Sequence, residues 1–212
     1  MLVTISDTET GGFTQEHSVL SVGALVGNVD TGEVIDGFES LVKLPSLSDY
    51  NVTQGALEVN GLSTLNCFKY GQTPSEIADR LVDLHLTTGS AVIGGHNFEY
   101  DVRMLCKHIF DSCTNFEFDS TFGYRKIDSS PIIRLLQGVE GIKATAKLGD
   151  AAKGMKIDTS NFDKTCGKMF TYEDRKSGFH GALFDSYVTF LILCKFRRIM
   201  TTPDNTKLFT SV

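Results

Sequence analysis

The chain has 212 residues, which is the size of one ordinary protein domain. Hydrophobic residues make up 41% of it and charged residues 22%, a balance typical of a globular protein with a substantial core. The formal net charge of −6 argues against a protein that coats nucleic acid through bulk electrostatic attraction. It does not exclude an enzyme that acts on phosphates, because bound cations reverse the local electric field.

The cysteines and the apolar runs limit where the protein works. No two of the five cysteines have C-x-x-C spacing, which argues against a zinc ribbon and a secreted disulfide framework. The chain does not begin with a signal-peptide pattern, and its longest apolar runs, residues 19–26 and 188–194, are too short to span a bilayer. We therefore expect a cytoplasmic protein with reduced thiols and no membrane partner.

The first part of the chain predicts an antiparallel meander. Residues 2–5 and 19–26 have the apolar character of buried strands, and a glycine pair at residues 11–12 separates them. A turn signal at residues 30–32 precedes a third strand pattern over residues 34–44. Strand, break, strand, turn and strand in this order indicate three antiparallel strands.

The middle of the chain changes to helical patterns. Residues 56–62 predict a short helix, and Thr73 followed by Glu76 has the layout of a capped helix start. Apolar residues then recur at helical spacing until Gly89. Residues 91–95 predict a short strand after this helix.

The last part of the chain continues the alternation. Residues 116–118 alternate like a strand, and residues 119–136 predict a helical segment capped by an aspartate. A helix is expected over residues 143–152, an irregular loop over residues 158–178 and a long helix over residues 181–200.

This order predicts the α/β fold class. A three-strand meander followed by helix–strand alternation indicates one mixed sheet with helices on its faces. We expect a single domain over residues 1–200 and a polar C-terminal tail over residues 201–212.

The first candidate site is the Asp-Thr-Glu-Thr stretch at residues 7–10. Strand side chains alternate between faces, so Asp7 and Glu9 project to the same side if the first strand continues that far. Two neighbouring acids repel each other, and a hard divalent cation with oxygen ligands is the usual compensation. For this stretch alone, a solvated strand end is the more common alternative.

The second candidate site follows the predicted strand over residues 91–95. Asn97 is a favourable helix cap, and Asp101 lies four residues later on the same helical face. The positive end of the helix dipole favours an acid or an anionic ligand there. A cap followed by a surface acid is the common alternative.

The third candidate site begins the last helix. Asp185 has apolar neighbours and no Lys or Arg three or four residues away, so it needs another partner if it is buried. His180 precedes it at a spacing that does not share a helical face, which places the imidazole above the acid rather than beside it. Histidine has an unperturbed pKa of about 6.5, which suits a general base near neutral pH. The alternative is a capping or surface histidine.

Several other polar and aromatic residues are interpreted as structural. Phe98 is expected in the core, whereas Phe13 is a candidate for stacking on nucleic-acid bases. Caps or solvated acids are expected at Asp119, Asp128 and Asp150. The histidines interpreted as structural are His17, His85, His96 and His108.

Taken in order, the three stretches resemble the motifs of the DEDDh 3′–5′ exonucleases. This is the family of the proofreading subunit of bacterial DNA polymerase III, RNase T and oligoribonuclease. The resemblance rests on Asp-x-Glu-Thr, Asn-x-x-x-Asp and His-x-x-x-x-Asp, and covers residues 1–196. Residues 56–62 also resemble a family segment, with Asn60 where many members have histidine. Gly181 departs from the pattern, because the family usually has aspartate after the motif histidine.

The resemblance implies an RNase H-like fold with a five-stranded mixed sheet, made of the three-strand meander plus parallel strands and flanked by helices. It also implies a metal-binding site and a general base, His180. The implied metal ligands are Asp7, Glu9, Asp101 and Asp185.

The resemblance further implies two Mg²⁺ ions, for which Mn²⁺ should substitute. The reaction would be hydrolysis of the 3′-terminal phosphodiester of single-stranded or frayed DNA, with release of nucleoside 5′-monophosphates. Thr8 and Thr10 would contact the terminal nucleotide, and Asn97 would orient a phosphate or a ligand.

Two alternatives remain open at this point. RNA or short oligonucleotides would be the substrate if the chain is closer to RNase T or oligoribonuclease. A non-catalytic RNase H-like binding module is the other alternative. The acidic net charge is compatible with a polymerase or repair partner that delivers the nucleic acid.

Overall fold

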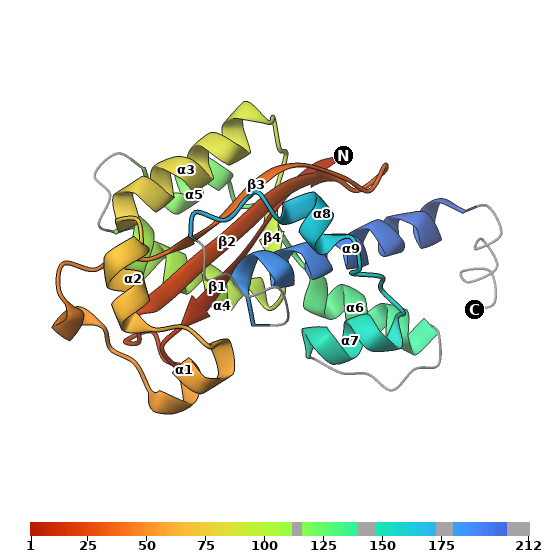
Figure 1. The fold of residues 1–212 in the computed structure, drawn as a ribbon. Coiled ribbons are helices and arrows are strands. Elements are labelled where there is room, and N and C mark those ends of the chain that lie inside the picture. Colours follow the sequence, from red (N-terminus) through yellow and green to blue (C-terminus); the bar gives the residue numbers. More distant parts are fainter. Residues whose placement is uncertain (112–115, 140–146, 173–179, 203–212) are drawn as a thin grey trace.

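The structure, a computed structural model, describes residues 1–111, 116–139, 147–172 and 180–202. Within these residues, five strands form one mixed sheet in the spatial order β3–β2–β1–β4–β5 (Figure 1). β1 pairs antiparallel with β2 and parallel with β4. The strands are β1 (Leu2–Thr10), β2 (Val19–Asn28), β3 (Glu33–Leu41), β4 (Ile93–Gly95) and β5 (Lys126–Asp128).

Helices cover both faces of the sheet (Figure 1). One face carries α3 (Pro74–Thr87), α4 (Phe98–Leu105) with the π-helical turn η2 (Cys106–Phe110), and α5 (Phe118–Phe122). The other face carries α6 (Ser129–Val139), α7 (Leu148–Gly154), α8 (Phe162–Cys166) and the long α9 (Ala182–Thr201). Short elements at the end of the sheet where β1 stops are η1 (Leu47–Asp49), α1 (Gln54–Asn60) and α2 (Thr64–Tyr70).

Alternation along β1 decides which side its acids face. Val3 and Ile5 are fully buried in the apolar cluster that includes α9. Thr4 points to the other face, where its hydroxyl lies 2.8 Å from Nδ1 of His85 on α3. Because the alternation continues, Asp7 and Glu9 lie on the α9 face of the sheet.

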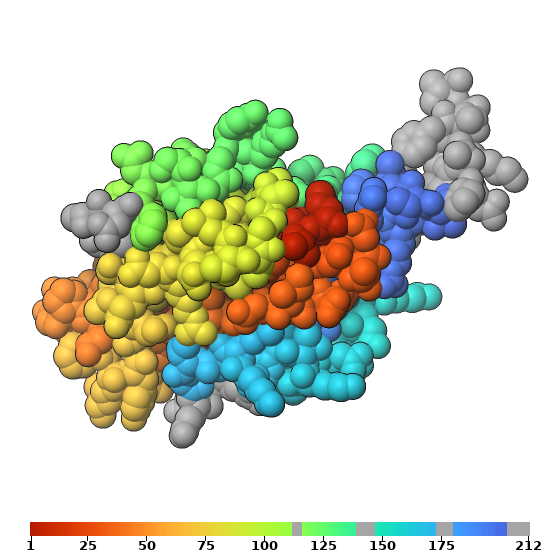
Figure 2. Space-filling model, turned by 90° about the horizontal axis from the view of Figure 1, so that it is seen from above, coloured from red at the N-terminus to blue at the C-terminus, as the bar shows by residue number. Residues whose placement is uncertain are grey.

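A short stretch of chain covers the outer edge of β3. The backbone N–H of Glu39 donates to the carbonyl of Met169, and the N–H of Thr171 donates back to the carbonyl of Glu39. The space-filling view shows the orange β2–β3 strands between α3, in yellow, and the light blue α8 region (Figure 2). The edge strand is therefore paired around Glu39, whereas Glu33, Ile35 and Asp36 in its first half are exposed.

A glycine sets how closely α9 approaches the sheet. Asp7 pairs with Gly23, and Gly23 pairs with Glu39, so these three residues form one row across β1, β2 and β3. A Cβ atom added to Gly23 would lie 2.2 Å from the backbone nitrogen of Leu183. The hydroxyl of Ser186 also donates to the carbonyl of Gly23 at 3.3 Å. The first turn of α9 therefore rests directly on β2, beside Asp7.

Most of the predicted architecture is confirmed. The mixed five-stranded sheet, the three-strand meander and the long last helix are all present. The capped helix start at Thr73 is also present, with Glu76 Oε2 accepting from the Thr73 backbone N–H at 2.8 Å. The first strand is longer than predicted, because β1 continues through Asp7 and Glu9 to Thr10.

Three predictions in the second half are wrong. Residues 116–118 do not form a strand, since Phe118 begins α5 and packs against Phe110 and Phe122. Residues 119–136 are not one helical segment, because β5 separates α5 from α6. The loop over residues 158–178 contains α8.

Parts of three predicted segments lie outside the described residues. These are residues 143–146 of the predicted helix, residues 173–178 of the predicted loop and residues 203–212 of the predicted tail. Thr201 is the last residue of α9 rather than part of a tail. Among the described helices, all are too short or too polar to cross a membrane.

Replacing Gly23 with alanine should displace the first turn of α9. The new methyl group would clash with backbone atoms of Ala182 and Leu183, which cannot rotate away. Such overpacking costs about 1–3 kcal/mol, so thermal unfolding should occur at a lower temperature than in the unchanged protein. Gly55→Ala on α1 is the matched control, because among the described residues no heavy atom lies within 4 Å of a Cβ there. Equal stability of the two variants would contradict the close approach of α9.

Candidate active site

The carboxyl end of β1 carries the first two acids. Asp7 and Glu9 are both half-buried and lie on the α9 face of the sheet. The pairing of β1 with β2 becomes irregular between Glu9 and Thr10. Regular sheet structure therefore ends immediately after the two acids, as is common next to functional sites.

Asp101 reaches the same place from α4. β4 is parallel to β1, so α4, which follows β4, begins at the same end of the sheet as the carboxyl end of β1. Asp101 is 4% exposed, and its Oδ1 accepts the backbone N–H of Thr8 at 3.0 Å and the Thr8 hydroxyl at 2.6 Å. These two bonds hold Asp101 against Thr8, the residue between Asp7 and Glu9 in the sequence.

Asp185 and His180 come from the beginning of α9. The backbone N–H of His180 donates to Oδ2 of Asp185 at 3.3 Å. His180 is exposed and adopts a positive φ of 68°. Ligand atoms of Glu9, His180 and Asp185 all lie within 4.8 Å of one another. The structure thus brings Glu9 together with both predicted residues of the last motif.

Electrostatic repulsion is strong where these acids meet. Burial raises the pKa of Asp7 well above its ordinary value, and the neighbouring carboxylates of Asp101, Asp185, Glu9 and Glu39 raise it further. Burial raises the pKa of Asp101 to about 7, although the two hydrogen bonds from Thr8 oppose the shift.

The donor set fits a hard divalent cation. Ligand atoms of Glu9, His180 and Asp185 form one cluster, and Asp7 is repelled by the neighbouring carboxylates of Glu9, Asp101 and Asp185. Carboxylate oxygens are the ligands that Mg²⁺ and Mn²⁺ prefer. A cation among them would also offset the repulsion that raises the pKa of Asp7. The residues that could hold it are Asp7, Glu9, Asp101 and Asp185.

An open cleft of about 390 Å³ adjoins these acids. Phe13 stands at its edge with 97% of its surface exposed, which is unusual for a large apolar side chain. The cleft combines acids, hydroxyls, rings and an amide in its lining: Asp7, Thr8, Thr10, Phe13, His96, Asn97, Tyr100 and Asp101.

The loop that carries Phe13 is attached to α4 and η2. The Tyr100 hydroxyl donates to the carbonyl of Gly12 at 2.9 Å. Lys107 pairs with Glu16 at 2.6 Å, and Nε2 of His108 lies 2.8 Å from the carbonyl of Gln15. The same helix that supplies Asp101 therefore also positions the exposed ring beside the cleft.

The three predicted substrate contacts have different surroundings. The Thr8 hydroxyl is bonded to Asp101, so its observed contact is with a candidate metal ligand. The Thr10 hydroxyl donates to the carbonyl of Gly12 at 2.8 Å. Asn97 begins α4 as predicted, but among the described residues its side chain makes no capping hydrogen bond.

The backbone of Asn97 explains this difference. Its φ of 54° and ψ of 41° are left-handed, whereas a capping residue is normally extended. Oδ1 of Asp128 accepts the Asn97 backbone N–H at 3.0 Å and the Ser130 N–H at 2.8 Å. Asp128 is thus a cap, as predicted, and it bridges β5 and α4 next to the cleft.

The structural interpretation of the other histidines holds for three of them. His85 bonds to Thr4, His17 bonds to Thr14 and His108 contacts Gln15. His96 is different, because it bonds to the Ser129 hydroxyl at 3.0 Å and also lines the cleft. Phe98 is 1% exposed and belongs to the core, as expected.

Sequence reasoning missed Tyr100 and Glu39. Tyr100 lies within the second motif, but its contact with Gly12 arises only from the fold. Glu39 is 1% exposed on β3, and its carboxylate contributes to the raised pKa of Asp7. The available signal for Glu39 was a charged residue inside the strand pattern predicted over residues 34–44.

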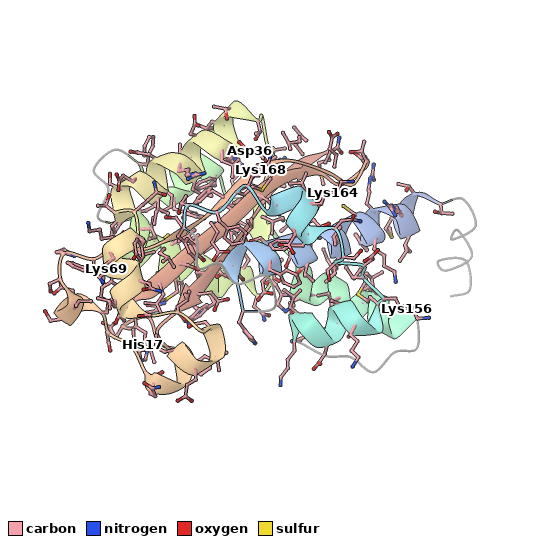
Figure 3. The ribbon with its side chains drawn as sticks, in the orientation of Figure 1. His17, Asp36, Lys69, Lys156, Lys164 and Lys168 are labelled. Atoms are coloured by element: carbon pink, nitrogen blue, oxygen red, sulfur yellow. The ribbon has the colours of Figure 1, made fainter. Side chains whose placement is uncertain are left out.

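The four lysines labelled in Figure 3 lie on different parts of the molecule. Lys69 lies at the end of the molecule that carries α1 and α2, near His17, whereas Lys156 lies at the opposite end beside α7 (Figure 3). Lys164 and Lys168 lie on α8 and just after it.

Comparison by sequence gives no relative. No protein-family model matches the chain, and no curated protein matches it in sequence.

Comparison by structure gives several nucleases. E. coli exonuclease I in complex with a dT13 oligonucleotide has a TM-score of 0.70 and 18% identity, over 98% of this chain and 42% of that chain. The zinc ion-bound E. coli exonuclease I–ssDNA complex has a TM-score of 0.70 and 19% identity, over 99% of this chain and 43% of that chain. Exonuclease X in complex with 5′-overhanging duplex DNA has a TM-score of 0.58 and 18% identity, over 96% of both chains.

These likenesses differ in how much of the other protein they include. The chain spans less than half the length of exonuclease I but nearly the whole length of exonuclease X. At this level of identity the likeness concerns the fold. With the observed strand order and flanking helices, it shows that the chain has the RNase H-like α/β fold predicted from its sequence.

Proposed function

We propose that the protein is a metal-dependent 3′–5′ exonuclease that hydrolyses the 3′-terminal phosphodiester of single-stranded DNA. The observation that carries this proposal is the convergence of Asp7, Glu9, Asp101, Asp185 and His180 from three distant segments. The likeness to exonucleases solved with bound DNA supports it.

The four acids would serve as metal ligands. When bound, two Mg²⁺ or Mn²⁺ ions would polarise the phosphodiester and stabilise the negative charge that develops during hydrolysis. Thr8 would keep the Asp101 carboxylate oriented through its two hydrogen bonds. A hydrogen-bond donor that orients a metal ligand usually increases both the metal affinity and the reaction rate.

His180 would act as the general base. Its exposed position before α9 lets the imidazole meet a water molecule near Glu9 and Asp185. The imidazole would take a proton from that water as the water oxygen attacks phosphorus. The bond between phosphorus and the 3′ oxygen of the penultimate nucleotide then breaks. That oxygen takes a proton from solvent to become a 3′ hydroxyl, and a nucleoside 5′-monophosphate leaves.

The cleft would hold the terminal nucleotide. The exposed ring of Phe13 offers a surface for base stacking, which is independent of base identity. Thr10 and Asn97 also line the cleft and would contact the sugar or a phosphate. An open cleft next to the acids favours a single strand, because a paired end would have to fray before its last base could stack.

Degradation of end-labelled DNA tests the activity and the metal assignment together. With Mg²⁺, the protein should shorten 5′-labelled single-stranded DNA from its 3′ end, and a chelator should stop the reaction. Asp185→Asn should lower the rate by more than about 100-fold. Loss of a residue that only supports a metal ligand costs up to about 100-fold, and Asp185 is proposed to be a ligand itself. Asp150→Asn is the matched control, since Asp150 is an exposed acid on α7.

Several outcomes would contradict this assignment. Undiminished digestion by Asp185→Asn would remove Asp185 from the site. Faster digestion of RNA than of DNA of equal length would support the ribonuclease alternative. Binding of either nucleic acid without any cleavage would support a non-catalytic module.

Replacing His180 with alanine tests the general base. Removal of a general base lowers a rate by about 10²- to 10⁴-fold, so single-turnover cleavage should slow to this extent. The variant should also show a flatter dependence of the rate on pH near neutrality, because it lacks a titrating imidazole base. The measurement is the pH profile at saturating Mg²⁺, and a profile with the same shape in both proteins would exclude His180 as the base.

A further inference from the structure

Glu39 is a buried acid that the proposed reaction does not use. It lies on β3 with 1% of its surface exposed, and burial raises the pKa of its carboxyl. Burying a carboxylate is unfavourable unless several donors satisfy it. Two close donors do so here: the Tyr172 hydroxyl lies 2.5 Å from Oε1, and the Leu183 backbone N–H lies 2.8 Å from Oε2.

The two donors lie on either side of His180 in the sequence. Tyr172 follows the stretch that pairs with the edge of β3, and Leu183 belongs to the first turn of α9. Each carboxylate oxygen thus accepts from one flank of the segment that carries His180. A single side chain on the sheet connects both flanks.

The bond to Leu183 replaces a helix cap. The first N–H groups of a helix lack partners within the helix, and a capping side chain usually accepts one from the second or third residue. The capping position of α9 is Gly181, which has no side chain. Glu39 supplies the missing acceptor from β3, with a negative charge that the helix dipole favours.

The sheet register connects Glu39 to the candidate metal ligands. Glu39, Gly23 and Asp7 occupy one row across three strands and point to the same face. The backbone of α9 contacts the sheet at Gly23, in the middle of this row. Fixing Leu183 at one end of the row therefore sets where Asp185 lies relative to Asp7 at the other end.

We propose that Glu39 is a positioning residue, whose carboxylate holds both flanks of the His180 segment on β3 and so places His180 and Asp185 against Asp7 and Glu9. The catalytic part of this inference rests on the proposed exonuclease function. The structural part concerns only the attachment of α9.

Two substitutions of Glu39 separate positioning from simple stability. Glu39→Ala removes both acceptors, and it should lower kcat by about 10- to 100-fold, as loss of a partner of a metal ligand does. The KM for single-stranded DNA should change by less than about threefold, because Glu39 is not among the residues that line the cleft. Glu39→Gln keeps an oxygen for the Leu183 N–H and an amide that can donate to Tyr172, so it should restore most of kcat.

Tyr172→Phe covers the case in which Glu39→Ala does not fold. It removes one of the two close bonds to the carboxylate and leaves the Leu183 bond in place. Its kcat should fall less than that of Glu39→Ala, again without a change in KM. Thr171→Val is the matched control, because the Thr171 hydroxyl bonds to the Glu39 backbone carbonyl at 3.1 Å and not to the carboxylate.

Hydrogen exchange gives a readout that does not depend on activity. Peptides covering residues 180–190 should exchange faster in Glu39→Ala and Tyr172→Phe than in Thr171→Val, and at the original rate in Glu39→Gln. Unchanged exchange in Glu39→Ala would overturn the proposal. It would also be overturned if Tyr172→Phe had the same kcat and the same exchange rate as Thr171→Val. A wild-type protein without nuclease activity would instead refute the proposed function, and exchange would still test the attachment of α9.

Discussion

Repulsion between carboxylates at the carboxyl end of β1 is the constraint on which the site depends. Asp7 receives this repulsion from acids on β1, α4, α9 and β3, and burial weakens the solvation that would relieve it. Asp101 is partly compensated by the two donors of Thr8. The fold keeps these acids together although they destabilise the metal-free protein, which is typical of a site organised for a cation rather than for stability.

Much of the fold and the core of this site could be predicted because their signals are local or follow simple periodicity. The i, i+2 spacing of Asp7 and Glu9 needs only a strand to place both on one face, and β1 continues far enough to do so. The Thr73–Glu76 capping box and the apolar spacing along α9 are equally local. Asp101, Asp185 and His180 were assigned to the same site as the first two acids only through the resemblance to a known family. No local sequence pattern could have predicted that these distant segments meet.

The features that escaped prediction depend on tertiary contacts. Phe118 looked like part of a strand, but aromatic packing against Phe110 and Phe122 favours a helix there. The strand β5 has only three residues, all partly exposed, so its alternation is too short to detect. Glu39 acquires its contacts from Tyr172 and Leu183, which are distant in sequence, and only its charge inside the predicted third strand pointed to it.

The most direct test of this account is the thermal stability of the metal-free protein as a function of pH. Burial raises the pKa of Asp101 to about 7, so the folded chain binds more protons than the unfolded chain between about pH 4 and pH 7. Stability from this source is therefore present below about pH 4 and is lost as the pH rises towards 7. We predict that the chelated protein unfolds at a lower temperature at pH 7.5 than at pH 5, that Mn²⁺ restores stability at pH 7.5, and that Asp7→Asn weakens both effects. Equal unfolding temperatures at both pH values, with no response to Mn²⁺, would contradict the claim that these acids form a metal site.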